Sequence, residues 1–207
     1  MVPITTLLLD ADGVVQQPPA DWRQGLAALC GQPGAEEAFL ADVFRAEGPA
    51  LRSPVDFAPR LAEVLERWRS PASVEEALLH WHRIEPDGAV LSLVSMLRER
   101  GTVVGLATNQ QRRRADYMIE ALGYAERFDG LFFSYRIGYA KPETGYFEAV
   151  LAELDRRPEE VLFLDDHEAN VDAARSLGLA AEVFELSQGI AAMETVLQAH
   201  GLWETQS

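Results

Sequence analysis

Short apolar runs alternate with amphipathic stretches along most of the chain. Near-continuous apolar runs predict buried strands, and apolar residues spaced three and four apart predict helices. The expected strands cover residues 7–9, 102–107, 131–133, 161–164 and 180–184. The expected helices cover residues 90–101, a stretch that ends at Gly123, and residues 143–154, 170–177 and 189–199. Apolar strands that alternate with helices are typical of a parallel sheet covered by helices on both faces, and residues 7–9 must join that sheet.

Residues 16–88 interrupt this alternation. After Pro18-Pro19 every apolar pattern has helical spacing, and Ser73 with Glu76 matches a capping box that opens one of the helices. We expect four helices and no strand in this insert. The chain would then consist of an α/β core, residues 1–15 and 89–207, and a helical insert, residues 16–88.

Composition excludes several classes of protein. The 207 residues carry a formal net charge of −15, which argues against binding nucleic acid or an anionic membrane. The single cysteine, Cys30, allows no internal disulfide. No apolar run reaches the length of a membrane span, and residues 1–9 lack the basic start of a signal peptide. We therefore expect a soluble, cytoplasmic protein; a small anionic ligand stays compatible with it, because local groups decide the field at a site.

Polar side chains follow the predicted strands at the points where the strands end. They are Asp10, Asp12, Thr108, Asn109, Lys141, Asp165 and Asp166. In open parallel sheets, ligands bind at the carboxyl ends of the strands. Four carboxylates against one lysine predict a hard divalent cation, and Mg²⁺ fits best because it binds a few carboxylates together with phosphate and water.

Asp10 and Asp12 lie two residues apart, so in an extended segment both side chains point to the same side. Two carboxylates that close repel each other by about 4 kcal/mol at an effective dielectric of about 20. The pair is tolerated if a cation lies between them or if one carboxyl keeps its proton. A solvated turn of the Asp-x-Asp-Gly type explains the same residues without any function.

The other polar pairs also have structural explanations. Thr108 or Asn109 could cap the helix that follows, and one of Asp165 and Asp166 could do the same for a later helix.

Lys141 could be a solvated surface charge. However, Pro142 suits the first position of a helix and keeps the residue before it extended. The ammonium of Lys141 could then reach back toward the strand ends.

Four short motifs therefore stand at successive strand ends. They are Asp10-Ala11-Asp12-Gly13-Val14, Ala107-Thr108-Asn109, Ala140-Lys141-Pro142 and Leu164-Asp165-Asp166 followed by Asn170. In order and spacing they resemble the motifs of the haloacid dehalogenase-like hydrolases, and the insert resembles the α-helical cap of that superfamily. The resemblance covers nearly the whole chain and implies an α/β fold with a Rossmann-like parallel-sheet core and a small helical-bundle cap. One departure is Ala11, where the family often has a bulkier residue, without effect on the chemistry.

The resemblance implies phosphoryl transfer from a small phosphorylated metabolite. Asp10 would be the nucleophile that forms an aspartyl-phosphate. Asp12 would protonate the leaving oxygen and then activate water. Thr108, Asn109 and Lys141 would hold the phosphoryl group. We expect such an enzyme to be a monomer or a homodimer.

The resemblance also implies how Mg²⁺ is bound. Its ligands would be the Asp10 carboxylate, the Asp12 backbone carbonyl and Asp165, with Asp166 as a further ligand or as a partner of the ligands. With only its backbone facing the metal, the Asp12 side chain would be free to carry a proton. We therefore expect a raised pKa for Asp12, coupled to the titration of Asp10.

Three alternatives stay open. Haloacid dehalogenases use the first aspartate to attack carbon, need no metal and lack the second aspartate, so Asp12 argues against that activity. A phosphomutase with a short cap would carry the same motifs. A non-catalytic domain that binds a phosphorylated ligand usually loses a motif residue, and none is missing here.

The substrate is not predicted by the motifs. Polar or aromatic candidates in the cap are Trp22, Arg23, Arg45, Arg52, Arg60, His80, Trp81 and His82. Trp68 and Trp81 lie on apolar helix stripes, which favours a packing role. His167 follows the acidic pair and either borders the site or lies on the surface at a helix start.

Overall fold

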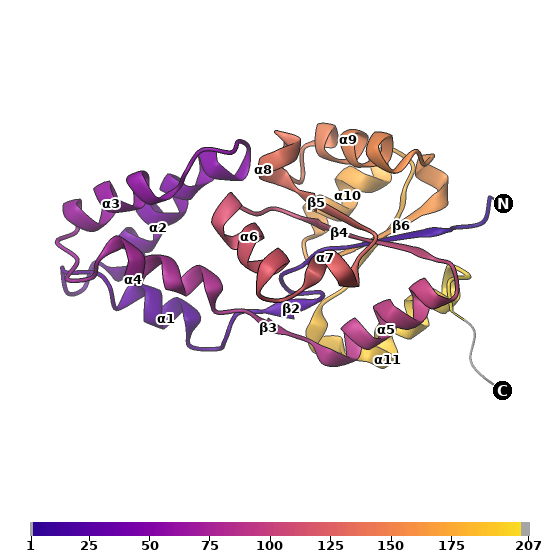
Figure 1. Ribbon diagram of the computed structural model, residues 1–207, viewed down its shortest axis with the longest axis horizontal. Coiled ribbons are helices and arrows are strands. Elements are labelled where there is room, and N and C mark those ends of the chain that lie inside the picture. The colour runs from indigo at the N-terminus through magenta and orange to yellow at the C-terminus, as the bar shows by residue number, and fades with distance from the viewer. Residues whose placement is uncertain (1, 204–207) are drawn as a thin grey trace.

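A five-stranded parallel sheet forms the centre of the computed structural model, which describes residues 2–203 (Figure 1). Its strands are β1 (Thr6–Leu9), β4 (Val103–Thr108), β5 (Gly130–Phe133), β6 (Val161–Asp165) and β7 (Ala180–Val183). Their order across the sheet is β5-β4-β1-β6-β7, and all neighbours are parallel. The predicted α/β fold with a Rossmann-like sheet is confirmed.

Helices cover both faces of this sheet (Figure 1). One face packs against α5 (Gly88–Glu99), α6 (Arg112–Glu120), α7 (Tyr124–Arg127) and α11 (Ile190–Ala199). The other packs against α9 (Thr144–Leu154) and α10 (Glu168–Ser176), and α8 (Ser134–Ile137) directly follows β5. The four-residue helices α7 and α8 were not predicted because a single turn is too short to show a helical period. Within residues 2–203, none of the helices has both the length and the apolar character needed to cross a membrane.

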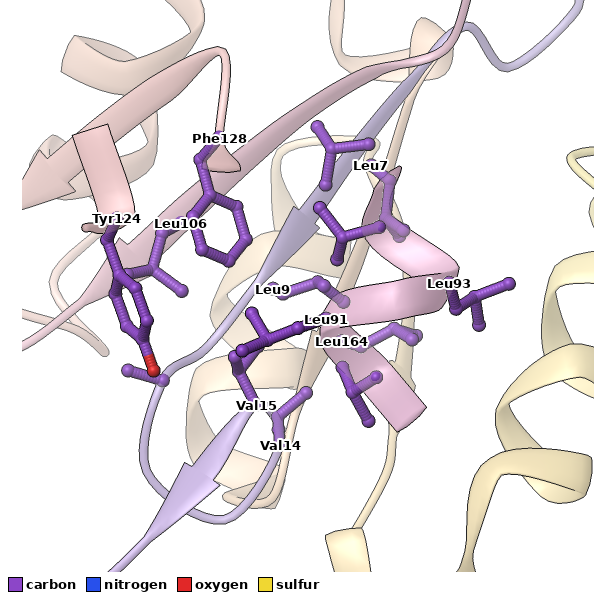
Figure 2. Close-up of a cluster of buried hydrophobic side chains, with 14 of the residues drawn as sticks. Leu7, Leu9, Val14, Val15, Leu91, Leu93, Leu106, Tyr124, Phe128 and Leu164 are labelled. Atoms are coloured by element: carbon purple, nitrogen blue, oxygen red, sulfur yellow. The ribbon is translucent and has the colours of Figure 1, made fainter. Parts of the chain in front are cut away.

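The central strand β1 is buried on both faces, which explains its continuous apolar run. Leu7 and Leu9 point into the cluster under α5, where they meet Leu106 and Leu164 of the neighbouring strands (Figure 2). Leu8 points to the opposite face, toward α9 and α10. Each fully buried leucine contributes about 1.5–3 kcal/mol to the stability of the fold.

The insert packs around an apolar cluster of its own, which includes Phe39, Leu61 and Trp81. Its helices are α1 (Trp22–Ala27), α2 (Glu36–Glu47), α3 (Ala58–Arg67) and α4 (Val74–Leu78), with the 3₁₀ turns η1 (Gly48–Leu51) and η2 (Leu79–His82). The predicted capping box opens α4: Ser73 Oγ accepts from the Glu76 N–H at 3.2 Å, and the Ser73 N–H donates to Glu76 Oε2 at 2.8 Å. We keep the proposed division into a core and a cap formed by residues 16–88.

The expectation that the insert has no strand is wrong. Its two ends pair as a short antiparallel ribbon of β2 (Gln16–Gln17) and β3 (Glu85–Pro86), which lies where the chain leaves and re-enters the core (Figure 1). With two residues on each side, the ribbon is too short to show an alternation of apolar and polar positions, so the sequence pattern carries no strand signal there.

Candidate active site

The ends of β1 and β6 bring Asp10 and Asp165 together. Leu9 pairs with Leu164 in the sheet register, and the Asp10 N–H donates to the Leu164 carbonyl at 2.9 Å. The strand order reverses at β1, since β4 lies on one side of it and β6 on the other. In sheets of this kind a ligand crevice opens at such a switch point.

Lys141 lies between these two carboxylates. Its Nζ is 2.8 Å from Asp10 Oδ1 and 2.6 Å from Asp165 Oδ2, and it donates to the Ala107 carbonyl at 2.7 Å. Both side chains are buried, with 1% of Lys141 and 0% of Asp165 exposed. Burial lowers the pKa of Lys141, but the two carboxylates raise it by more, so the net shift is upward and the ammonium stays charged.

Asn109 holds the Lys141 segment in place. Its Nδ2 donates to the Lys141 carbonyl at 2.8 Å, and its Oδ1 accepts from the Lys141 N–H at 2.9 Å. One N–H of the Asn109 amide is left over for a phosphate, beside its backbone N–H. The prediction that Pro142 is the first residue of a helix is wrong. The helix α9 begins at Thr144, and Glu143 is its N-cap.

Three carboxylates form a candidate metal centre. Oxygens of Asp10, Asp165 and Asp166 lie within 4.8 Å of one another. Burial raises the pKa of Asp10 to about 6 despite the nearby ammonium of Lys141, and burial also raises the pKa of Asp166. The surplus of negative charge over Lys141 and the all-oxygen donor set fit Mg²⁺.

Gly13 allows Asp166 to approach this centre. Its φ is +84°, which side-chain-bearing residues rarely adopt, and a Cβ there would lie 2.5 Å from Asp166 Oδ2. A glycine after the Asp-x-Asp sequence is therefore required by both the turn and the acidic residue packed against it.

Asp165 is held rigidly by the start of the next helix. Its Oδ1 accepts from the His167 N–H at 2.8 Å, and Asn170 Nδ2 donates to both oxygens at 2.9 and 3.0 Å. The N-cap residue of α10 is His167, whose exposed side chain makes no capping bond. Neither Asp165 nor Asp166 is therefore the N-cap of this helix, and capping does not explain why the two acids are present.

Asp12 points away from this centre, toward α6. Arg114 binds both of its oxygens, with Nη2 at 2.8 Å from Oδ1 and Nη1 on Oδ2. Gln16 and Gln110 each donate to Asp12 at 3.0 Å. Burial raises the pKa of Asp12, but the charge and hydrogen bonds of Arg114, with those of the two glutamines, lower it by more. The predicted upward shift of the Asp12 pKa is therefore wrong, and of these two aspartates it is Asp10 whose pKa is raised.

Asp10 and Asp12 were expected to point to the same side, as residues two apart do in an extended strand. This expectation is wrong because the strand ends before Asp12. β1 stops at Leu9, and the carbonyl of Ala11 accepts the N–H groups of Val14, Val15 and Gln16. The backbone curls around that carbonyl, so alternate residues no longer point to one side.

Thr108 ends β4 and is buried beside the same opening. Its hydroxyl accepts from Gln110 Nε2 at 3.2 Å. The N-cap of α6 is Gln111, whose side chain accepts from the Arg113 N–H at 2.7 Å. The capping explanation for Thr108 and Asn109 is thus excluded.

The strand ends line one cavity of about 370 Å³, called here the catalytic cavity. Its predicted residues are Asp10, Asp12, Thr108, Asn109, Lys141 and Asp166, and Gly13, Gln17, Pro18, His167 and Asn170 complete the lining. Three partners of Asp12 were not predicted from the sequence: Gln16, Gln110 and Arg114. Arg114 carried a weak signal, because it lies four residues before buried Met118 and so on the inner side of α6.

Residues 4–178 match the family model of the haloacid dehalogenase-like hydrolases. The chain belongs to this family. This haloacid dehalogenase-like hydrolase is 25% identical over 187 residues to the N-acetylmuramic acid 6-phosphate phosphatase of Pseudomonas aeruginosa, which covers 84% of this chain and 79% of that protein. It is 32% identical over 96 residues to the sesquiterpene phosphatase astK of Aspergillus oryzae, 46% of this chain and 49% of that protein. The second match thus spans about half of that relative's length.

Solved structures share the fold of this hydrolase. The HAD family enzyme bt-2542 of Bacteroides thetaiotaomicron, in complex with magnesium and inorganic phosphate, superposes with a TM-score of 0.75 at 22% identity. The match covers 92% of this chain and 98% of that chain, so core and cap elements both have counterparts.

Proposed function

We propose that this hydrolase is a magnesium-dependent phosphatase that cleaves a small phosphate monoester, with Asp10 as the nucleophile. The observation that carries the proposal is the convergence of three carboxylates and one buried ammonium on the carboxyl ends of β1 and β6. Such a site offers both a nucleophilic oxygen and the cations that a phosphate needs.

In the first step an oxygen of Asp10 attacks phosphorus, the bond from phosphorus to the leaving oxygen breaks, and Asp12 donates its proton to that oxygen. Lys141 and Thr108 hold the transferring group. In the second step Asp12 takes a proton from water, whose oxygen attacks phosphorus and frees Asp10 and inorganic phosphate. Asp10, Asp165, Asp166 and the Asp12 carbonyl would hold Mg²⁺, which when bound offsets the charge of the carboxylates and phosphate oxygens.

The surroundings of Asp12 suit the second step, because Arg114 favours the ionised carboxylate that a base needs. For the first step Asp12 must carry a proton. The negative charge of a phosphate bound beside Asp12 would raise the pKa of this carboxyl and so favour its protonated form, with Arg114 still in contact.

The comparisons support this proposal over its rivals. The name of the Pseudomonas relative describes a phosphatase of a small phosphorylated sugar, and the Bacteroides enzyme was crystallised with magnesium and phosphate. The second aspartate, which haloacid dehalogenases lack, is present as Asp12 and faces the catalytic cavity. A phosphomutase would return an isomeric phosphate ester and a binding domain would release nothing, so product analysis separates both from a phosphatase.

We expect hydrolysis of p-nitrophenyl phosphate to require Mg²⁺ and to stop in excess chelator, because the carboxylate cluster and a phosphate together are strongly anionic. Release of p-nitrophenol and inorganic phosphate measures this directly. Returning Mg²⁺ in excess over the chelator should restore the rate, which controls for loss of folded protein. Full activity in chelator would contradict the metal assignment, and release of halide from a 2-haloacid would then establish a dehalogenase.

Mg²⁺ binding should depend on pH because the cation competes with the proton on Asp10. With the pKa of Asp10 raised to about 6, affinity should fall about tenfold per pH unit below that value and level off above about pH 7. Calorimetry without substrate, between about pH 5 and pH 8, should also detect the released proton. Asp10→Asn should flatten this profile. An affinity that does not change over the same pH range would show that Asp10 is not a ligand.

A further inference from the structure

A second cavity of about 300 Å³ lies between the cap and the core, and we call it the cap-side pocket. Its defining residues are Trp22, Phe44, Glu47, Leu51, Trp81 and Arg114. It adjoins the catalytic cavity, because Asp12, Pro18 and Asn109 line both. An ester whose phosphate occupies the catalytic cavity would therefore extend its alcohol part into the cap-side pocket.

Aromatic rings form the walls of this pocket. Trp22 stands edge-on to Trp81 at 6.3 Å and stacks with Phe44 at 6.2 Å between ring centroids. Both indole N–H groups are already used, since Trp22 donates to the His80 carbonyl at 2.5 Å and Trp81 to Glu47 at 2.6 Å. The rings thus offer apolar surface and no hydrogen-bond donors.

Arg114 offers the pocket little positive charge. Its guanidinium binds both oxygens of Asp12, donates to Gln110 Oε1 at 2.9 Å and donates to the Trp81 carbonyl at 3.0 Å. The charge is balanced by Asp12, and four of the five guanidinium N–H groups are engaged. A second anionic group on a ligand would find no free cation here.

Among the six defining residues of the pocket, Glu47 has a side-chain acceptor that is not used. It ends α2, and its Oε1 accepts the indole N–H of Trp81. Within residues 2–203 its Oε2 accepts no hydrogen bond, and Oε2 is not sealed from solvent. Burial raises the pKa of Glu47 to about 7, and the bond from Trp81 opposes that shift only in part. An accepting oxygen thus stands free among apolar walls.

We propose that the cap-side pocket binds the alcohol part of the substrate, and that it selects an alcohol with an apolar surface, a hydrogen-bond donor for Glu47 and no second anionic group. This inference rests on the proposed phosphatase function and names its substrate class. The donor is an ammonium or a hydroxyl group, since a carboxylate accepts from both and aromatic faces pack against cations and against the C–H faces of a polyol.

The test compares kcat/KM for four esters, with p-nitrophenyl phosphate as a reference. They are 2-aminoethyl phosphate, glucose 6-phosphate, hexyl phosphate and phosphoglycolate. At least one of the first two should exceed hexyl phosphate and phosphoglycolate by about tenfold or more, because a site built around an acceptor rejects ligands that lack the donor. A preference for phosphoglycolate or hexyl phosphate would overturn the proposal.

Two variants identify the group that Glu47 binds. Glu47→Leu should lower kcat/KM for the preferred ester about tenfold or more and leave hexyl phosphate unchanged within about twofold. Glu47→Gln keeps an acceptor without charge, so it should lower turnover of an ammonium ester to the same extent but leave a hydroxyl ester within about threefold. Glu63→Gln, on the exposed side of α3, is the matched control and should change nothing. Equal losses on all esters in both Glu47 variants would show a purely structural role and overturn the proposal.

Binding to the Asp10→Asn variant separates this inference from the proposed function. Calorimetry with the same four esters needs no turnover, so the pocket is tested even if the chain is not a phosphatase. The same order of affinity is expected, and Glu47→Leu in that background should remove the advantage of the donor-bearing ester. If the donor-bearing esters bind no more tightly than hexyl phosphate and phosphoglycolate, the proposal for the cap-side pocket is overturned. The phosphatase proposal would not be affected by that result.

Discussion

Asp10→Asn should lower turnover of any phosphate ester by about four orders of magnitude or more, equal to at least about 5.5 kcal/mol of barrier. Asparagine keeps the shape of the side chain but has no anionic oxygen to attack phosphorus. Asp10 Oδ1 lies 2.8 Å from Lys141 Nζ, and Asp10 is one of the three carboxylates of the candidate metal centre. The same substitution therefore removes the nucleophile and one metal ligand.

The fold should survive this substitution. Burial disfavours the charged form of Asp10, as its pKa of about 6 shows, so a neutral amide is tolerated at this position. Lys141 keeps Asp165 as its partner at 2.6 Å. A thermal unfolding curve close to that of the wild type, together with single-turnover kinetics, would attribute the loss to chemistry.

Asp172→Asn, an exposed aspartate on α10, is the matched control and should leave turnover unchanged. Near-normal turnover of Asp10→Asn would show that Asp10 is not the nucleophile. Normal turnover together with unchanged Mg²⁺ binding would remove Asp10 from the metal centre as well.

Asp12→Asn should cause losses that depend on the leaving group. An alkyl alcohol leaves poorly without a proton, so hydrolysis of alkyl phosphates should fall by about two to four orders of magnitude. Aryl phosphates need less help from an acid, and their first step should fall at least about tenfold less. Single-turnover assays on one alkyl and one aryl phosphate, with Mg²⁺ saturating, measure the difference.

Arg114 must be controlled for in this experiment, because Asp12→Asn also leaves a largely buried guanidinium without its carboxylate partner. Arg114→Gln removes the same ion pair and keeps the acid. It should not widen the gap between alkyl and aryl esters, because the acid remains and has lost the cation that disfavours its protonated form, whereas Asp12→Asn should widen that gap. Equal first-step losses on both esters in Asp12→Asn would make Asp12 a structural residue.

Local patterns in the sequence were enough to place the sheet and most of the strand-end residues. The run Leu7–Leu9 is apolar because β1 is covered on both faces, and the first polar residue after it is Asp10. Parallel strands end at one edge of the sheet, so residues after separate apolar runs come together without knowledge of their contacts. This explains why the sequence predicts Asp10 and the pair Asp165-Asp166, whereas Lys141 comes after α8 and not directly after β5.

Only the tertiary structure decided which way Asp12 points and what binds it. The contacts of Asp12 with Gln110 and Arg114 join residues 98 and 102 positions apart, and that of Glu47 with Trp81 spans 34 positions. A hydrophobic period reports which side of an element is buried, but not which distant polar groups meet there. These long-range contacts depend on where β1 ends, on how the chain turns around the Ala11 carbonyl and on how the cap packs against α6. For this reason the sequence located the acidic centre, while the charge state of Asp12 followed only from the packing of α6 against the turn after β1, and the chemistry of the cap-side pocket only from the packing of cap on core.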